Sequence, residues 1–215
     1  MALNPGKTKE EINRYYIQKA RSSFKARFDL LLYYRITNSK TADITTDDLE
    51  KFEIKDNLQV LREYVQVYWQ QETDNCIRGK KIDDIYNKMK NWRVDHKTNL
   101  DDLQKHYIMN MYERIFPSED FIHMIEDGKE CHYCHTSIDQ INRLIEKGKI
   151  YKKHITRGWS LEIDRMKPNY EYTKGNCVIC CYWCNNAKTD EFSYDEFVEI
   201  GKEIEKVWHG RLNSK

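Results

Sequence analysis

The chain has 215 residues, of which 33% are charged and 40% hydrophobic, and its formal net charge is +1. This composition is typical of a soluble globular protein and argues against extensive disorder. The sequence has no run of about 18 apolar residues and no hydrophobic core of a secretory signal near its start. We therefore expect a cytoplasmic protein that makes no membrane contact.

Charge is distributed unevenly along the first third of the chain. Residues 1–40 hold nine Lys or Arg against three Asp or Glu, whereas residues 41–72 hold three against eight. One interpretation is a basic arm that binds phosphates beside an acidic helical segment. The alternative is two solvated helix faces whose charges offset each other.

Helical periodicity dominates the first half of the chain. Apolar side chains recur at intervals of three or four over residues 8–37, which predicts a long helix that the adjacent Ser22 and Ser23 could interrupt. Thr45 is followed by acidic residues and predicts a helix N-cap. Further helices are expected over residues 57–73, 83–92 and 99–116, and we expect their apolar stripes to form a core.

The pattern changes at Pro117. Beyond it, glycines at 128, 148, 158 and 175 separate shorter segments, whereas the preceding part contains only Gly6 and Gly79. We place a domain boundary here, between a helical domain at 1–117 and a second domain at 118–215. The second domain is expected to contain short helices, two strands and closing helices, so the predicted fold class is α+β.

Two cysteine pairs in the second domain have the spacing of metal ligands. Cys131 and Cys134 form one CxxC pair, and Cys181 and Cys184 form another. Two such pairs complete the tetrahedral four-sulfur site that zinc adopts in structural roles, and disulfides are not expected in a cytoplasmic chain. Because a closed four-thiolate site has no open position, the zinc is expected to brace the fold, and any chemistry must lie elsewhere.

The remaining cysteines and two histidines leave alternatives open. Cys177 and Cys180 form an overlapping CxxC pair, but they alternate with apolar residues as in a strand, so we assign them to packing. His132 and His135 could replace a thiolate. Cys76 lies far from the pairs in sequence and is expected in the core.

Residues 159–192 predict a strand, a turn-rich loop, a second strand and a helix. Together with the cysteine pairs, residues 128–190 resemble the HNH, or ββα-metal, nuclease family. That family has an acidic residue and a histidine ending the first strand, an asparagine before the second, and Asn and Lys after the last CxxC. The matching positions are Asp164, Asn176, Cys181, Cys184, Asn185 and Lys188.

Arg165 stands where the family has its catalytic histidine, and arginine cannot act as a base because it stays protonated. A branch that includes rare-cutting HNH restriction endonucleases is more similar, since it combines Asp-Arg with a downstream tyrosine and a metal-binding asparagine. Here Tyr172 follows Asp164 by eight residues and Asn185 follows it by twenty-one. Taken singly, these residues could instead be a surface ion pair, a packing residue and a helix cap.

The resemblance implies a role for each matching residue. Asp164 and Asn185 are expected to bind Mg²⁺, and Arg165 to hold a phosphate. Tyr172 is expected to act as the base or to position water, and Asn176 to tie the loop between the strands. Glu162 shares a strand face with Asp164 and could line the site. His154 is an alternative base.

The implied function is a Mg²⁺-dependent DNA endonuclease, restriction-like or in phage defence. Alternatives are a homing or phage-encoded nicking endonuclease, and an inactive zinc-braced DNA-binding protein. Residues 149–174 hold seven Lys or Arg against three Asp or Glu, which suits phosphate binding. Lys167, Lys174 and Lys188 are predicted DNA contacts, and Trp159 and Tyr170 could pack on sugar or base. Cutting both strands with one site per chain requires a homodimer or two successive nicks.

Overall fold

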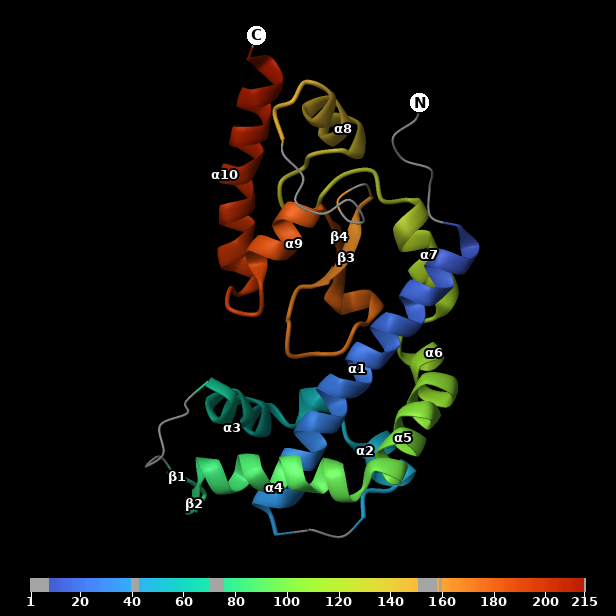
Figure 1. Cartoon of the computed structure of the whole chain (residues 1–215), viewed down its shortest axis with the longest axis vertical. Helices are drawn as coiled ribbons and strands as arrows, with labels where there is room; N and C mark the ends of the chain where they lie inside the picture. Colours follow the sequence, from blue (N-terminus) through green and yellow to red (C-terminus); the bar gives the residue numbers. More distant parts are fainter. Residues whose placement is uncertain (1–7, 40–42, 70–75, 151–157, 159, 215) are drawn as a thin grey trace. The chain divides into compact units, whose positions relative to one another are not determined.

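The computed structural model describes residues 8–39, 43–69, 76–150, 158 and 160–214 (Figure 1). The fold is α+β, with mostly helices and two small antiparallel sheets among these residues. None of the described helices is both long and apolar enough to cross a membrane.

The described residues divide into two compact units. The cysteine unit comprises those within Met1–Tyr16, Phe116–Pro168 and Tyr172–Lys215, and the helical unit those within Ile17–Ile115 and Asn169–Glu171. The main division falls between Ile115 and Phe116. The two units are not consecutive along the chain, unlike the predicted domains at 1–117 and 118–215. The start of the first helix belongs to the cysteine unit, and residues 169–171 belong to the helical unit.

Helix α1 (Lys9–Thr37) is continuous through Ser22 and Ser23, so the predicted interruption is absent. The Ser22 hydroxyl donates to the Gln18 carbonyl oxygen at 3.1 Å, and Ser23 is fully buried, so both serines fit within the helix. Helix α2 (Thr46–Lys51) begins as predicted. Its N-cap, Thr45, forms a capping box with Asp48, in which each side chain accepts from the other residue's amide.

The rest of the helical unit follows the predicted periodicity with local differences. Its elements are η1 (Ile54–Asp56), α3 (Leu58–Trp69), β1 (Cys76–Ile77), β2 (Lys80–Lys81), α4 (Ile82–Asp95), α5 (Lys97–His106), η2 (Tyr107–Met111) and α6 (Tyr112–Ile115). The single helix expected over 99–116 is divided by the π-helical turn η2. Cys76 lies on the β1–β2 hairpin and is exposed, so its predicted place in the core is wrong.

An aromatic core and a buried charge cluster hold the helical unit. The rings of Phe24 and Phe28 stack at 5.3 Å, and Phe28 also contacts Trp92. Arg27, only 2% exposed, donates from Nε and Nη2 to the two carboxylate oxygens of Glu171 at 2.8 and 3.0 Å. The pairing compensates for the burial of both charges.

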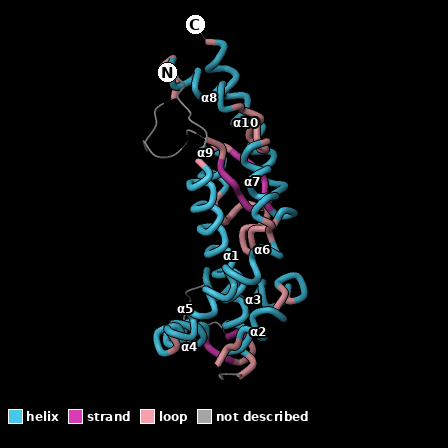
Figure 2. Tube along the Cα trace, turned by 90° about the vertical axis from the view of Figure 1, so that its right-hand side faces the viewer, coloured by secondary structure: helices cyan, strands magenta, loops and turns pink. Residues whose placement is uncertain are grey.

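The cysteine unit surrounds one short antiparallel strand pair, drawn in magenta in Figure 2. Its elements beyond the start of α1 are α7 (Ser118–Glu126), α8 (Ile138–Glu146), β3 (Glu162–Arg165), η3 (Lys174–Asn176), β4 (Cys177–Cys180), α9 (Tyr182–Lys188) and α10 (Tyr194–Asn213). Strand β3 pairs with β4 so that Asp164 lies opposite Val178 and Arg165 opposite Cys177. Helix α9 contacts β3 and α10, and α10 also contacts α8.

Candidate functional site

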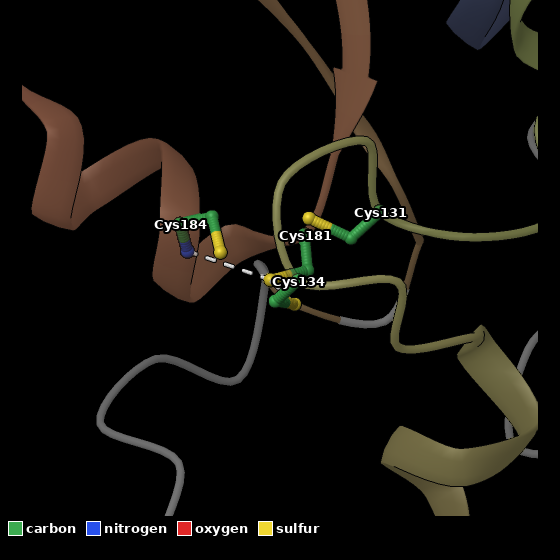
Figure 3. A group of neighbouring side chains, drawn as sticks. All are labelled: Cys131, Cys134, Cys181 and Cys184. Atoms are coloured by element: carbon green, nitrogen blue, oxygen red, sulfur yellow. Dashed lines mark hydrogen bonds between the residues drawn. The ribbon is translucent and has the colours of Figure 1, made fainter. Parts of the chain in front are cut away.

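The four predicted zinc ligands lie together in the core of the cysteine unit. Cys131 and Cys134 come from the loop before α8, Cys181 is the N-cap of α9, and Cys184 lies in its first turn. All four are buried, with sulfur atoms within 4.8 Å of one another. Figure 3 shows the two pairs converging, with the Cys184 amide donating to the Cys181 sulfur at 3.4 Å. The cluster could hold a metal ion such as zinc.

The spacing and chemistry of the sulfur atoms fit such an ion. Tetrahedral zinc–sulfur bonds place neighbouring sulfurs about 3.8 Å apart, and the Cys134 and Cys181 sulfurs are separated by 3.8 Å. None of the four cysteines forms a disulfide within the described part of the chain. Hydrogen bonds with the Cys131 and Cys134 sulfurs, and then burial, raise the pKa of Cys181. A divalent cation reverses this effect because it stabilises thiolates.

The alternative ligands lie elsewhere. Cys177 and Cys180 are buried in β4 and are not part of the four-sulfur group, as expected for packing residues. The exposed His132 ring nitrogen Nε2 is 2.7 Å from the Tyr194 hydroxyl, and the exposed His135 faces Glu130 at 3.5 Å. Among the described residues, the candidate ligand set therefore consists of the four cysteine sulfur atoms.

Asp164 lies on β3, and two donors hold its Oδ2 atom. The Tyr133 hydroxyl donates to Oδ2 at 2.8 Å, and the Lys188 ammonium lies 3.3 Å from the same oxygen. Burial, and then the Asp164 charge, raise the pKa of the Tyr133 phenol, so it remains a donor. No donor among the described residues reaches Oδ1.

Asn185 lies on α9 and faces Glu162 on β3. Its Nδ2 atom donates to Glu162 Oε2 at 2.6 Å. Because the amide nitrogen faces the carboxylate, Oδ1 is the atom left to accept from, or coordinate, another group. Glu162 and Asp164 are two residues apart and share a strand face. Through Asn185 and Lys188, this face contacts two successive turns of α9.

Arg165 and Tyr172 form a separate pair. The guanidinium carbon of Arg165 lies 4.7 Å from the centre of the Tyr172 ring, a cation–π arrangement. Tyr172 is only 8% exposed. Strand alternation favours opposite faces of β3 for Arg165 and Asp164. No hydrogen bond within the described part of the chain joins Tyr172 to Asp164 or Asn185.

Asn176 ties together the two ends of the loop between the strands. Its Oδ1 accepts from the Lys167 amide at 2.9 Å, and its Nδ2 donates to the Lys167 carbonyl oxygen at 3.1 Å. The Asn176 carbonyl oxygen also accepts from the Met166 amide at 2.8 Å. These bonds tie the two ends of the loop together, and the inclusion of Asn176 among the catalytic residues stays a prediction.

The structure corrects one predicted DNA contact and modifies another. Lys188 is fully buried at the end of α9, where its ammonium donates to the Arg165 carbonyl oxygen at 2.8 Å. A buried, paired ammonium cannot contact a DNA backbone outside the protein, so that prediction is wrong. Lys174 is exposed but pairs with Asp120 at 2.8 Å. Lys167 is exposed.

Several other predicted site residues lie outside the described part of the chain or close to it in sequence. His154 and Trp159 lie outside the described residues, as do residues 151–157 of the basic stretch. Tyr170 is partly buried. Tyr133 was not identified from the sequence. Its position between Cys131 and Cys134 places it beside the cysteine cluster, but gives no indication of its contact with Asp164.

Comparisons with protein-family models, with curated proteins and with solved structures give no match to this chain.

Proposed function

We propose that this protein is an HNH-type endonuclease that hydrolyses phosphodiester bonds in DNA with a divalent cation. One observation carries the proposal: β3 and α9, beside the four cysteines, present Asp164 and Asn185 with one side-chain oxygen each left available. Neighbouring side chains hold the other polar atom of each group. This arrangement is typical of metal ligands oriented by surrounding hydrogen bonds.

The donor set fits Mg²⁺. Carboxylate and amide oxygens are hard ligands, and Mg²⁺ commonly uses one or two carboxylates with waters and a substrate phosphate. Within the described part of the chain, the cysteines are the only cluster of three or more His, Cys, Asp or Glu side chains close enough to hold an ion. In a site with one carboxylate, the Asn185 amide oxygen, waters and a substrate phosphate would supply the remaining ligands. When bound, Mg²⁺ would supply positive charge that stabilises the transition state.

Arg165 and Tyr172 supply the remaining chemistry in this proposal. The Arg165 guanidinium can hold two oxygens of a phosphate and offset their developing charge. The Tyr172 hydroxyl orients the attacking water or accepts its proton, although an ordinary phenol, with a pKa of about 10, is a weak base at neutral pH. Because Arg165 already lies over the Tyr172 ring, the two side chains are expected to act together.

DNA contacts are proposed for Lys167 and Lys174 on the loop between the strands. Lys174 would exchange its exposed Asp120 partner for a phosphate, and such surface pairs contribute little energy. The helical unit is proposed to supply target recognition or dimerisation. A homodimer would bring two sites to the two DNA strands.

The test is cleavage of supercoiled plasmid by purified protein with and without Mg²⁺. We expect cleavage by the wild type and a loss of at least about 100-fold in Asp164→Ala, because the metal ligand is removed. Asp190→Ala, which removes an exposed carboxylate from the same unit, is the control and should cleave normally. Absence of cleavage on any DNA by zinc-loaded wild type would contradict the proposal.

Tyr172→Phe tests the role of the phenol, with Tyr170→Phe as the control in the same loop. A fall in the cleavage rate confined to Tyr172→Phe supports the proposed role, whereas equal rates would exclude the hydroxyl but leave the nuclease proposal standing. Linear product at early times would indicate coordinated double-strand cutting by a dimer. Open circles alone would indicate a nicking enzyme.

A zinc-braced DNA-binding protein without catalysis is the second candidate. It is favoured by the burial of Tyr172, whose side chain is only 8% exposed. In that case wild type and Asp164→Ala would shift DNA equally in a gel, and neither would cut it.

A further inference from the structure

Tyr133 joins the cysteine site to Asp164. It lies between Cys131 and Cys134 in sequence, and its hydroxyl donates to Asp164 Oδ2 at 2.8 Å. The loop that would hold a structural ion therefore also holds the carboxylate proposed to bind the catalytic one. The resemblance to HNH nucleases assigned no role to this residue.

The rest of the structure fixes Tyr133 firmly. Its side chain is 1% exposed, and its ring meets the edge of Phe197 on α10 at 4.9 Å. A Cβ atom at Gly201 would lie 2.4 Å from the Tyr133 carbonyl oxygen, so α10 packs directly against the backbone of Tyr133. The neighbouring His132 amide donates to the Ile179 carbonyl oxygen of β4 at 2.8 Å. Hence the hydroxyl has little freedom to follow a moving carboxylate.

The hydrogen bond sets the direction of the carboxylate. Tyr133 and Lys188 both engage Oδ2, so Oδ1 is the atom that would coordinate the proposed ion. With Lys188 alone, at 3.3 Å, the carboxylate can rotate about its last bond, because one donor fixes a position less well than two. Hydrogen bonds to a metal ligand typically change metal affinity or activity by about 10- to 100-fold.

We propose that Tyr133 is a positioning residue that makes the metal affinity of Asp164 depend on an intact cysteine site. The proposal rests on the proposed function, since it needs a divalent cation at Asp164 and Asn185. It goes further by assigning the coupling between the two sites to one hydroxyl group.

The test compares Tyr133→Phe with Tyr194→Phe. Each variant loses one hydroxyl whose hydrogen bond links the Cys131–Cys134 loop to another element. The Tyr133 hydroxyl, in the loop, contacts Asp164 on β3, whereas the Tyr194 hydroxyl, on α10, contacts His132 in the loop. Zinc content is measured by elemental analysis, and Mn²⁺ affinity by electron paramagnetic resonance of the free ion. We expect all proteins to retain zinc, and the Mn²⁺ dissociation constant to rise about tenfold in Tyr133→Phe alone.

Cleavage supplies the second readout. In Tyr133→Phe, the Mg²⁺ concentration for half-maximal cleavage should rise while the rate at saturating Mg²⁺ stays near that of the wild type. If the wild type binds Mn²⁺ and Tyr133→Phe binds it with the same affinity, the role of Tyr133 is overturned but the proposed function stays intact. An equal loss of Mn²⁺ affinity in Tyr194→Phe would also overturn the role of Tyr133. So would a loss of zinc from Tyr133→Phe. A wild type that binds no Mn²⁺ would overturn both proposals.

Discussion

Lys188 carries a positive charge into the interior of the cysteine unit. Its side chain is 1% exposed and contacts Asp164 Oδ2 and the Arg165 carbonyl oxygen, both on β3. A buried ammonium is tolerated only when it is paired and hydrogen-bonded. Lys188 therefore joins the end of α9 to the end of β3 in addition to orienting Asp164.

Replacing this charge should destabilise the unit. We expect Lys188→Met to lower the free energy of unfolding by about 3 kcal/mol, because it leaves a partly buried carboxylate without its ion pair. The measurement is urea unfolding with zinc present. Lys202→Met is the control, since that lysine is half-exposed and paired only across one helical turn. Similar midpoints for the two variants would show that the buried pair contributes little.

The sequence predicts which residues belong to the site better than it predicts how they are oriented. The cysteine spacing was sufficient to bring four sulfurs together, and the order of Asp164 and Asn185 was sufficient to place them on adjacent elements. Spacing does not determine which face the last residue of a short helix presents, so the burial of Lys188 was missed. The contact of Tyr133 with Asp164 spans 31 residues, and no local pattern encodes it.

At the scale of elements, the boundary between β4 and α9 decides which cysteines join the four-sulfur cluster. Strand β4 ends at Cys180, and Cys181 turns the chain as the N-cap of α9. A thiolate pair can then approach one ion from a single helix start. The same turn keeps Cys177 on the strand, away from the other sulfurs.

Serine substitutions test this assignment. We expect Cys181→Ser and Cys184→Ser to lose most of the bound zinc, because an alcohol is a poor ligand for it. Cys177→Ser should keep one zinc per chain and serves as the matched control. Native mass spectrometry of each purified variant gives the stoichiometry. Loss of zinc from Cys177→Ser with retention in Cys181→Ser would contradict the assignment.

The buried cluster in the helical unit predicts a response to alkaline pH. The Tyr107 hydroxyl donates to Glu171 Oε1 at 2.5 Å, and burial, followed by the Glu171 charge, raises the pKa of this phenol. Below about pH 10 the phenol is protonated in both states, so its contribution to stability is complete. Above that pH the Tyr107 phenol ionises in the unfolded chain but stays protonated in the folded protein, so the free energy of unfolding falls.

This fall should be about 1.4 kcal/mol per pH unit for a single phenol. We expect Tyr107→Phe to be less stable at pH 8, since it lacks the bond to Glu171, but to lose less stability between pH 10 and pH 11. Urea unfolding at each pH measures both effects. The wild type and Tyr107→Phe would have parallel pH profiles if Tyr107 ionised normally in the folded state.

Among the elements themselves, long periodic segments were predicted most completely. Helix α1 was expected, but its continuity was not, because adjacent serines favour interruption unless one is buried and the other bonds back to the helix. The β1–β2 hairpin has two residues per strand, too few for an alternating pattern. Its formation depends on positive φ at Arg78 and Gly79.

At the scale of the whole molecule, the two units are built from interleaved parts of the chain. Helix α1 contributes residues to both, and residues 169–171 belong to the helical unit although they lie between β3 and β4 in sequence. Glu171 is fixed within the helical unit by Arg27 and Tyr107. Composition alone could not indicate that Glu171 belongs to the helical unit, because its contact with Arg27 joins residues 144 positions apart.

Removal of the metal should affect the two units unequally. Binding of structural zinc contributes about 10–16 kcal/mol, which is comparable to the whole stability of a domain, about 5–15 kcal/mol. We therefore expect 1,10-phenanthroline to unfold the cysteine unit, so that the backbone amides of β3, β4 and α9 lose protection in hydrogen exchange. Amides of α4 and α5 should remain protected, because the aromatic core around Phe28 and Trp92 contains none of the four clustered cysteines. The non-chelating isomer 1,7-phenanthroline is the control. Equal loss of protection in α4 and α5 would contradict this expectation and mean that the two units unfold cooperatively. The Arg27–Glu171 bond would then fail to hold residues 169–171 in place once β3 and β4 unfold.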